Sequence, residues 1–194
     1  NDIYIGSRYQ TPEGINQNFI QKYNEKSGLK WVENDLNSDV FAIHKDNNNI
    51  YVGGIFDKMF RRWNGSSWET MNAAPEQLVR AIATKGSEIY IGGDFMKTGM
   101  STVNYIARWN GSAWTAMDNG VNDTVKAIVI YKNNVVVGGG FDYAGAMIPN
   151  TKGVVQWNGT AWQTLGNGVN GTVNTLAASD SLLFIGGQFS LAGT

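Results

Sequence analysis

Few side chains in this 194-residue chain are of the types that carry out catalysis, and their spacing matches no known catalytic motif. His44 is the only histidine and there is no cysteine, whereas catalytic metals use several imidazole or thiolate ligands. His44 alternates with Val40 and Ala42 along a strand-like run, which predicts a packed structural histidine. No Ser-His-Asp set, phosphate-binding loop or basic–aromatic surface for nucleic acid is present. We therefore expect no metal and no cofactor.

Carboxylates offer the other route to chemistry, because a pair of them can hydrolyse a glycosidic bond. The acidic residues in the long polar segments are Asp57, Asp94, Asp118, Asp123 and Asp142. No spacing singles out a catalytic pair among them. The stretch Asp118–Asp123 faintly resembles a calcium loop but lacks alternating oxygen ligands and a closing glutamate, so turn formation explains it better.

Composition places the chain among globular proteins, with 42% hydrophobic and 16% charged residues and a net charge of −1. This near-neutral balance gives no electrostatic footprint for nucleic acid or an anionic membrane. No run approaches the 18 apolar residues of a membrane span, so we expect no membrane insertion. The chain enters a strand-like run at Ile3, and we expect it to be a processed or excised piece.

A repeat organises the elements that position these residues. An apolar run ending in glycine recurs at residues 3–6, 50–54, 89–93, 135–139 and 183–187. A Trp-Asn-Gly turn followed by a second Trp recurs three times, as Trp63 with Trp68, Trp109 with Trp114, and Trp157 with Trp162, and a degenerate copy pairs Tyr23 with Trp31. Another apolar run begins ten residues ahead of each of the last four glycine-ending runs, at Val40, Val79, Val125 and Val173. Four short strands per repeat predict an all-β fold, a β-propeller of four-stranded antiparallel blades.

The residue types within the repeat resemble a known family. Gly-Gly closing the second strand, an aromatic on the third and a Trp on the fourth are similar to the kelch repeat and the kelch-like propeller of the galactose oxidase family. The variants Ile106–Ser112 and Gly168–Thr172 look like repeats of large secreted bacterial surface proteins. The resemblance implies a propeller fold, and an extracellular or cell-surface setting. It does not imply oxidase chemistry here, because that chemistry needs copper, several histidines and a cysteine.

The strands do not add up to a whole number of blades. We expect blades at about 1–36 (partial), 37–73, 74–119, 120–167 and 168–194 (partial). A four-bladed ring could close by pairing the strand at Val173 with residues 1–34, but a strand would be left over. A segment of a ring of six to eight blades is the favoured interpretation, with the remaining blades or another chain completing it.

The binding surface is expected on the face that carries the long loops, because a rigid scaffold usually presents its ligand sites there. The meander puts the short hairpins on one face, and the second-to-third and inter-blade connections on the other. Candidate binding residues on the long-loop face are Asp57, Lys58, Met59, Phe60, Asp94, Lys97, Asp118, Asp123, Asp142 and Tyr143. The loop Asp57–Phe60 is shorter than its equivalents and should leave a notch.

Three details of local geometry follow from the pattern. Asn110 and Gly111 should form a two-residue hairpin with both residues at positive φ, and such turns account for most of the Asn-x-Ser/Thr sequons without glycosylation. The first Trp of each pair should be buried between blades and the second half exposed. Val125, Ala127 and Val129 should share one face of a strand, with Ile128 and Ile130 on the other, and both faces should be largely buried.

These features favour a non-enzymatic recognition or scaffolding module that binds a protein or a glycan through the long-loop face. The alternative is a fragment of a secreted glycan-active or oxidase-like enzyme with its catalytic residues in other blades.

Overall fold

The computed structural model describes residues 2–10, 16–36 and 39–193, which form strands joined by turns and loops. The first sheet holds β1 (Asp2–Gln10), β2 (Asn16–Asn24) and β3 (Gly28–Leu36). The second holds β4 (Val40–Asp46), β5 (Asn49–Gly54), β6 (Phe60–Trp63) and β7 (Trp68–Thr70). The third holds β8 (Val79–Lys85), β9 (Glu88–Gly93), β12 (Ile106–Trp109) and β13 (Trp114–Ala116). The fourth holds β14 (Val125–Tyr131), β15 (Asn134–Gly139), β16 (Val154–Trp157) and β17 (Trp162–Thr164). The fifth holds β18 (Thr172–Ala178) and β19 (Leu183–Gln188), and the small hairpin β10 (Lys97–Thr98) and β11 (Ser101–Thr102) lies in the loop after β9.

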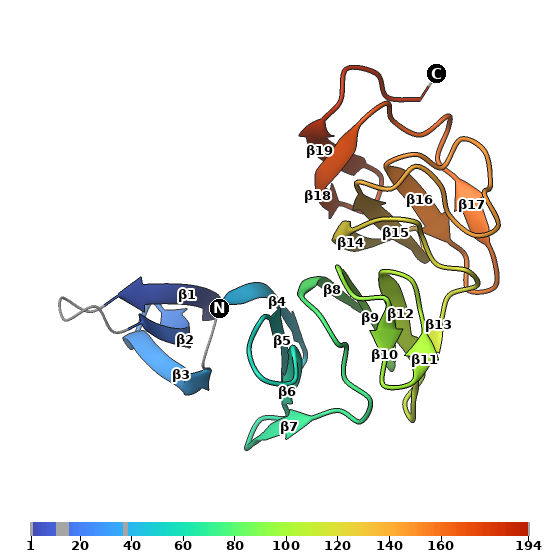
Figure 1. Cartoon of the computed structure of the whole chain (residues 1–194). Coiled ribbons are helices and arrows are strands. Elements are labelled where there is room, and N and C mark those ends of the chain that lie inside the picture. Colours follow the sequence, from blue (N-terminus) through green and yellow to red (C-terminus); the bar gives the residue numbers. More distant parts are fainter. Residues whose placement is uncertain (1, 11–15, 37–38, 194) are drawn as a thin grey trace.

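The sheets are antiparallel meanders that stand face to face around an open arc (Figure 1). The strands β4, β8, β14 and β18 line the inner side of this arc, and each contacts its neighbour in the next sheet. This is the blade arrangement of a β-propeller, as the repeat predicted. The strand β18 pairs with β19 and not with the first sheet, so the four-bladed closure through residues 1–34 is not formed in the described part of the chain.

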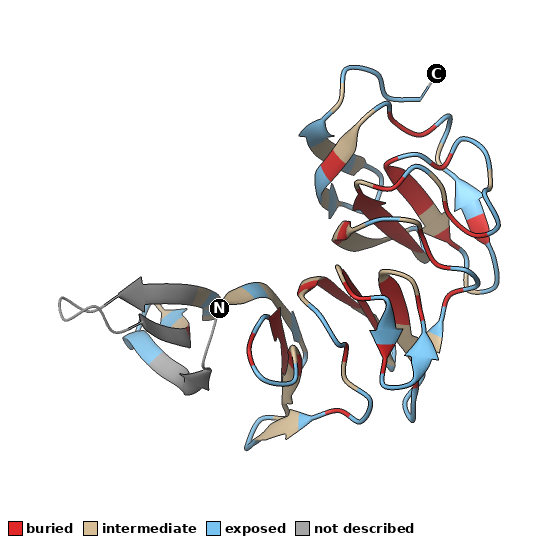
Figure 2. Cartoon of the chain, in the orientation of Figure 1, coloured by how far each residue is buried: buried red, intermediate tan, exposed pale blue. Residues whose placement is uncertain are grey.

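The hydrophobic core consists of successive layers between neighbouring sheets. In one such layer Tyr90 and Ile106 of the third sheet pack against Val125, Val135 and Val137 of the fourth. Glycines on the second strands let the sheets approach closely, since a Cβ added at Gly138 would lie 2.5 Å from Val173 Cγ1. Figure 2 shows the buried residues concentrated in the middle sheets. The burial of each sheet thus depends on the next one along the chain.

Each inner strand has a β-bulge near its start, and in β14 this bulge changes which side chains share a face of the strand. The register with β15 shifts between Val125 and Ala127, which leaves Lys126 unpaired. Val125 consequently shares a face with Ile128, because both lie against the position of Gly92 in the third sheet. The expected grouping of Val125 with Ala127 and Val129 was therefore wrong. The expectation that both faces are covered is confirmed, since every residue of β14 is buried or half-buried.

The Asn-Gly turns are four-residue loops and not the predicted two-residue hairpins. Trp109 pairs with Trp114, so residues 110–113 form the loop. Gly111 has φ of 101°, but Asn110 is not among the residues at positive φ. Instead, Asn110 Oδ1 accepts hydrogen bonds from the Ser112 and Ala113 amides, both at 3.0 Å. The asparagine is needed for this side-chain acceptor, and the glycine for the left-handed backbone.

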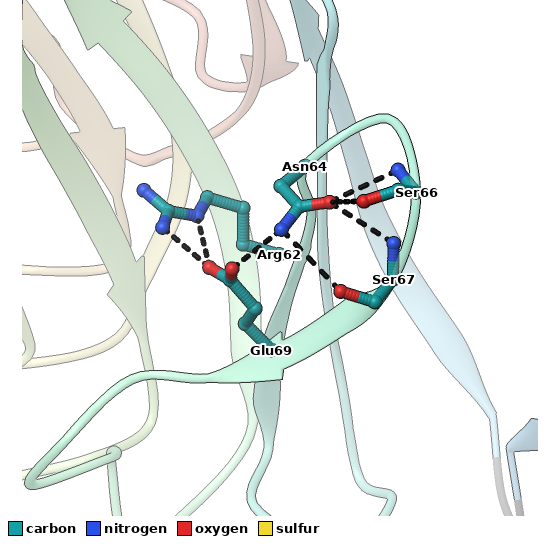
Figure 3. A network of polar contacts seen from close by, with 5 residues as sticks. All are labelled: Arg62, Asn64, Ser66, Ser67 and Glu69. Atoms are coloured by element: carbon teal, nitrogen blue, oxygen red, sulfur yellow. Dashed lines mark hydrogen bonds and ion pairs between the residues drawn. The ribbon is translucent and has the colours of Figure 1, made fainter.

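The same turn recurs at Asn64 and is extended there into a side-chain network (Figure 3). Asn64 Oδ1 accepts from the Ser66 and Ser67 amides at 3.0 Å, while its amide nitrogen donates to Glu69 Oε1 at 2.5 Å. Glu69 also accepts from Arg62 Nε at 3.0 Å, across the pair of strands. The Arg62 and Asn64 hydrogen bonds hold the pKa of Glu69 below its ordinary value. This network ties β6 to β7 on the short-loop face.

The burial of the tryptophans differs from the prediction in both directions. Trp157 is buried, as expected of the first Trp of a pair, but Trp63 and Trp109 are only half-buried, so that expectation was wrong for these two. Trp68, the second Trp of its pair, is half-buried as expected. Trp114 and Trp162 are each 5% exposed, so the expectation that the second Trp of a pair is half exposed was wrong for both. Each packs tilted or edge-on against its partner across the hairpin, with ring centroids 5.4 and 5.1 Å apart. In the first sheet the register places Leu29, not Trp31, opposite Tyr23.

His44 has the structural role expected of it. Its Nε2 lies 2.8 Å from Thr84 Oγ1 in the neighbouring sheet, and burial lowers its pKa. It therefore bridges β4 and β8 as a neutral, half-buried side chain.

Candidate functional site

The long-loop face carries the connections after β5, β9 and β15 and the segments that join successive sheets. The joining segments after the second, third and fourth sheets are each pinned to the loop of the next sheet by an isolated bridge, at Pro75–Thr98, Val121–Ala144 and Val169–Ala192. Asn122 reinforces its bridge, because its Oδ1 accepts from the Asp142 and Tyr143 amides at 2.9 and 3.0 Å. This face is therefore built of loops that are held in place, as a recognition surface requires.

Shallow grooves recur on this face where neighbouring sheets meet. One of about 450 Å³ lies beside the shortened loop of the second sheet, at Lys58 and Met59, and reaches Gly99. A second, of about 310 Å³, lies between Asn104 and Tyr143. A third, of about 380 Å³, lies between Lys152 and Leu191. The repeat thus produces a series of similar grooves with different linings.

The structure distributes the predicted binding residues over this face and does not gather them into one cluster. Lys58 and Met59 line the first groove and Tyr143 lines the second. Exposed acidic and basic side chains lie elsewhere in the loops, at Asp57, Lys97, Asp118 and Asp123. Asp142 forms an ion pair with Lys152 at 2.7 Å. Phe60 is fully buried against Tyr51 and Trp114 and belongs to the core.

A second feature is a row of side chains along the inner side of the arc, and Asp94 pairs with one member of this row. The β-bulges leave Phe41, Arg80, Lys126 and Asn174 out of the pairing register of the innermost strands. We call these four residues the inner-rim row. The Arg80 guanidinium carbon lies 5.7 Å from the centre of the Phe41 ring. Lys126 Nζ donates to Asn174 Oδ1 at 3.1 Å, so neighbouring sheets touch through these side chains.

The two cations of the inner-rim row differ in their partners. Arg80 and Asp94 form a bidentate pair with two hydrogen bonds of 2.8 Å, and this pair holds the pKa of Asp94 below its ordinary value. At the corresponding place opposite Lys126 the fourth sheet has Gly140, which has no side chain, and a Cβ added there would lie 3.5 Å from Asp123 Oδ2. Within the described residues, Lys126 is in no ion pair and bonds only the amide oxygen of Asn174. Lys126 lies near enough to Asp94 to contribute to lowering the pKa of that carboxyl, after the larger effect of Arg80. The row therefore places two cations around one carboxylate, and only Arg80 contacts it directly.

An apolar patch adjoins the charged part of the row. Phe41 is 48% exposed, and Ile55, which follows the Gly-Gly pair of the second sheet, is 43% exposed. Ile55 occupies the position that Asp94 holds in the third sheet. The inner rim thus presents an aromatic and aliphatic surface beside the Arg80–Asp94 ion pair and the ammonium group of Lys126.

Sequence reasoning included Asp94 but missed the inner-rim row itself. A signal was present, because the residue after the first valine of each inner strand differs from repeat to repeat, while its neighbours recur, as in Val79-Arg80-Ala81 and Val125-Lys126-Ala127. Strict alternation assigns these residues to an ordinary strand face. The β-bulge removes these residues from the regular strand pairing, and a strict alternation of inward and outward side chains does not predict a bulge.

The described residues lack two features. They contain no group of three or more histidine, cysteine, aspartate or glutamate side chains that could hold a metal ion. Nor does any helix there have the length and apolar character needed to cross a membrane.

Comparisons with known proteins support the fold. Residues 106–194 match the family model described as the Rax2 C-terminal beta propeller domain, which is less than half of the chain. Among curated proteins no match is found. The computationally designed Ika8 protein aligns with a TM-score of 0.58 and 15% identity over 91% of this chain and 53% of its own. For the designed Ika4 protein the TM-score is 0.50 at 18% identity, over 74% of this chain and 84% of its own.

A natural protein shows the same likeness. The extracellular domain of BT4673, a hybrid two component system from B. thetaiotaomicron, aligns with a TM-score of 0.58 and 17% identity. The alignment covers 95% of this chain but 26% of that one. The chain thus spans about half of the Ika8 chain and about a quarter of the BT4673 chain. At these identities the likenesses concern the β-propeller fold.

Proposed function

We propose that this chain is a non-enzymatic recognition and scaffolding module that binds a carboxylate-bearing protein or glycan partner on the inner side of its long-loop face. The single observation that carries the proposal is the placement of Lys126, a half-buried ammonium group that donates to the Asn174 amide oxygen, lies near Asp94 and forms no direct ion pair within the described residues. A carboxylate placed there would gain a charge-assisted hydrogen bond without breaking an existing ion pair.

The neighbouring side chains refine the ligand. Arg80 is already neutralised by Asp94, so the row favours one carboxylate and not a dense run of negative charge. Phe41 and Ile55 offer an apolar surface beside it. Two kinds of ligand combine one carboxylate with an apolar surface. One is an acidic peptide segment with an aromatic neighbour. The other is a glycan with one carboxylate per disaccharide and an apolar sugar face.

The setting proposed for the module is secreted or cell-surface, with blades of the kelch-like type. The sequence resemblance supports this, and so does a structural neighbour whose chain is itself an extracellular domain. The alternative of an enzyme fragment has less support, because Asp94 and Asp142 are engaged in ion pairs with Arg80 and Lys152. Carboxylates held in this way are poorly suited to acid–base chemistry.

Direct binding measurements with two probes test the proposal. The probes are an octapeptide with alternating glutamate and phenylalanine and a hyaluronan octasaccharide, each titrated against the whole chain while its amide resonances are followed. We expect one of them to shift resonances around Lys126, and Lys126→Ala to weaken its binding roughly tenfold through the lost charged hydrogen bond. Lys26→Ala removes the same charge from an exposed hairpin of the first sheet and should leave binding unchanged. Saturation of neither probe at millimolar concentration, or equal binding by Lys126→Ala and the wild type, would overturn the proposal.

A further inference from the structure

The groove between the third and fourth sheets differs from the other two grooves because none of its lining side chains is charged. Lys58 and Glu76 line the groove beside the second sheet, and Lys152 lines the groove that reaches Leu191. The middle groove, of about 310 Å³, is lined by amide, phenol and apolar side chains. We call it the tyrosine groove, and its main residues are Met96, Asn104, Tyr105, Asn119, Asn122 and Tyr143.

Tyr105 has a backbone conformation that favours glycine. Its φ is 67°, and the equivalent residue of the fourth sheet is Gly153, with φ of 69°. Matching hydrogen bonds show the equivalence, because the Gly93 amide donates to the Tyr105 oxygen at 3.1 Å and the Gly139 amide to the Gly153 oxygen at 3.0 Å. A bulky residue at positive φ is an outlier, and such strain clusters at ligand sites. Glycine would form this turn without strain, so the strain at position 105 points to a use for the tyrosine ring.

The two tyrosines of the groove come from different sheets and are held firmly. Tyr105 is half-buried, because it packs against the buried cluster of Ile106 and Met117 and also lines the groove. Tyr143 is half-buried in the loop of the fourth sheet, and Asn122 fixes its main chain on both sides. The Asn122 side-chain oxygen accepts from the Tyr143 amide at 3.0 Å, and the Asn122 amide donates to the Tyr143 oxygen at 3.3 Å. The groove therefore presents two phenol groups in fixed places.

Side-chain amides supply further hydrogen-bonding groups. Asn104 Nδ2 donates to the main-chain oxygen of Asn119 at 2.9 Å, which leaves its own Oδ1 as an acceptor. Asn122 uses its Oδ1 for two main-chain amides, which leaves its Nδ2 as a donor. The Asn119 side chain is exposed. Donors and acceptors thus surround the two rings without any charge among them.

We propose that the tyrosine groove binds an uncharged sugar residue of a glycan. A hexopyranose has a face of C–H groups that packs on an aromatic ring, and its hydroxyl groups both donate to and accept from amides and phenols. An ionised ligand is disfavoured, because its charge would lose water without meeting an opposite charge in the lining. The volume lies at the lower end of the range for ligand sites, which suits a single ring of a longer glycan.

This site is separate from the carboxylate site proposed at Lys126, which is not among the residues that line the groove. An uncharged oligosaccharide has no carboxylate for Lys126, so its binding does not depend on that proposal. Lys126→Ala should therefore bind an uncharged probe as the wild type does. Either proposal can fail while the other holds.

Titration of the whole chain with cellohexaose, maltohexaose and mannohexaose tests the inference, with amide resonances and calorimetry as readouts. The groove variants are Tyr143→Ala, Tyr105→Gly and Asn119→Ala, and circular dichroism checks that each keeps its fold. Tyr105→Gly removes the ring and introduces the residue that the fourth sheet has in this turn. Met59→Gly is the matched control, because Met59 has the same place in the second sheet, with φ of 52°, but lines a different groove.

We expect at least one of the three oligosaccharides to shift the amide resonances of Asn104, Asn119 and Asn122. Tyr143→Ala and Tyr105→Gly should each weaken its binding about tenfold, through the lost contact with a ring. Asn119→Ala should weaken it less, and Met59→Gly should bind like the wild type. Three results would overturn the inference: no saturation by any of the three at millimolar concentration, undiminished binding by both tyrosine variants, or an equal loss in Met59→Gly or Lys126→Ala.

Discussion

The indole nitrogen of Trp162 donates a hydrogen bond of 2.9 Å to the main-chain oxygen of Met117. Trp162 lies on β17, the outermost strand of the fourth sheet, whereas Met117 directly follows β13 of the third. One side chain therefore fills the core between two sheets and also satisfies a carbonyl in the segment that joins them.

Replacing Trp162 with Phe should lower the free energy of unfolding by about 0.5–1.5 kcal/mol through the lost hydrogen bond, beyond any loss of packing. The Gly120 amide still donates to the Met117 oxygen at 3.0 Å, so that oxygen keeps one partner. Trp114→Phe is the matched control, since Trp114 is equally buried but its indole nitrogen has no partner within the described residues. Urea denaturation should show the larger loss for Trp162→Phe. Equal losses would mean that the hydrogen bond contributes nothing beyond packing.

The close approach of neighbouring sheets can be tested at glycine. Gly138→Ala would place a Cβ 2.5 Å from Val173 Cγ1 on the next sheet, and overpacking of this kind costs about 1–3 kcal/mol. Gly186→Ala, at the same position of the fifth sheet, should cost less because only the Thr175 side chain is near. Thermal unfolding of the two variants measures the difference. A larger effect at Gly186 would contradict the packing described for the junctions.

The Asn-Gly turn makes a conformational prediction that packing does not affect. A Cβ at Gly111 would meet no atom within 4 Å, yet its φ of 101° disfavours β-branched residues. Gly111→Val should therefore destabilise the protein by roughly 1–3 kcal/mol. Ala113→Val, in the same exposed loop without a positive φ, should change stability by less than about 0.5 kcal/mol. Similar chemical denaturation midpoints for the two variants would rule out the left-handed turn.

His44 predicts a pH dependence with a defined sign. Burial lowers its pKa in the folded chain, so the unfolded chain binds the proton more readily. The stabilisation from neutral His44 should be complete above the ordinary pKa of 6.5 and should decrease as the pH falls below it. His44→Ala introduces the residue found at the equivalent positions 83 and 177, and it should flatten this dependence between pH 7.5 and pH 5. Identical pH profiles of wild type and variant, measured by urea denaturation, would contradict the assignment.

Much of the architecture could be predicted from the sequence because it depends on local, repeated signals. Alternating β-branched residues, Gly-Gly strand ends and Trp-Asn-Gly turns recur at nearly constant spacing, so each repeat independently indicates the same four strands. The sorting of short hairpins and long loops onto opposite faces follows from the meander alone. The incomplete first and last sheets were also foreseeable from the order of the repeat elements.

The facing of single residues was decided by the tertiary structure. Alternation misplaced Val125, because one bulged residue reverses the faces of the strand beyond it. The sequence could not show that the Asn110 side chain accepts hydrogen bonds from the backbone of the turn, because the two-residue hairpin and the four-residue loop use the same Asn-Gly dipeptide. Likewise, the contacts of Phe41 with Arg80 and of Lys126 with Asn174 join residues about 40 to 50 positions apart. Such contacts exist only once neighbouring sheets pack, which is why the inner rim is a property of the folded chain.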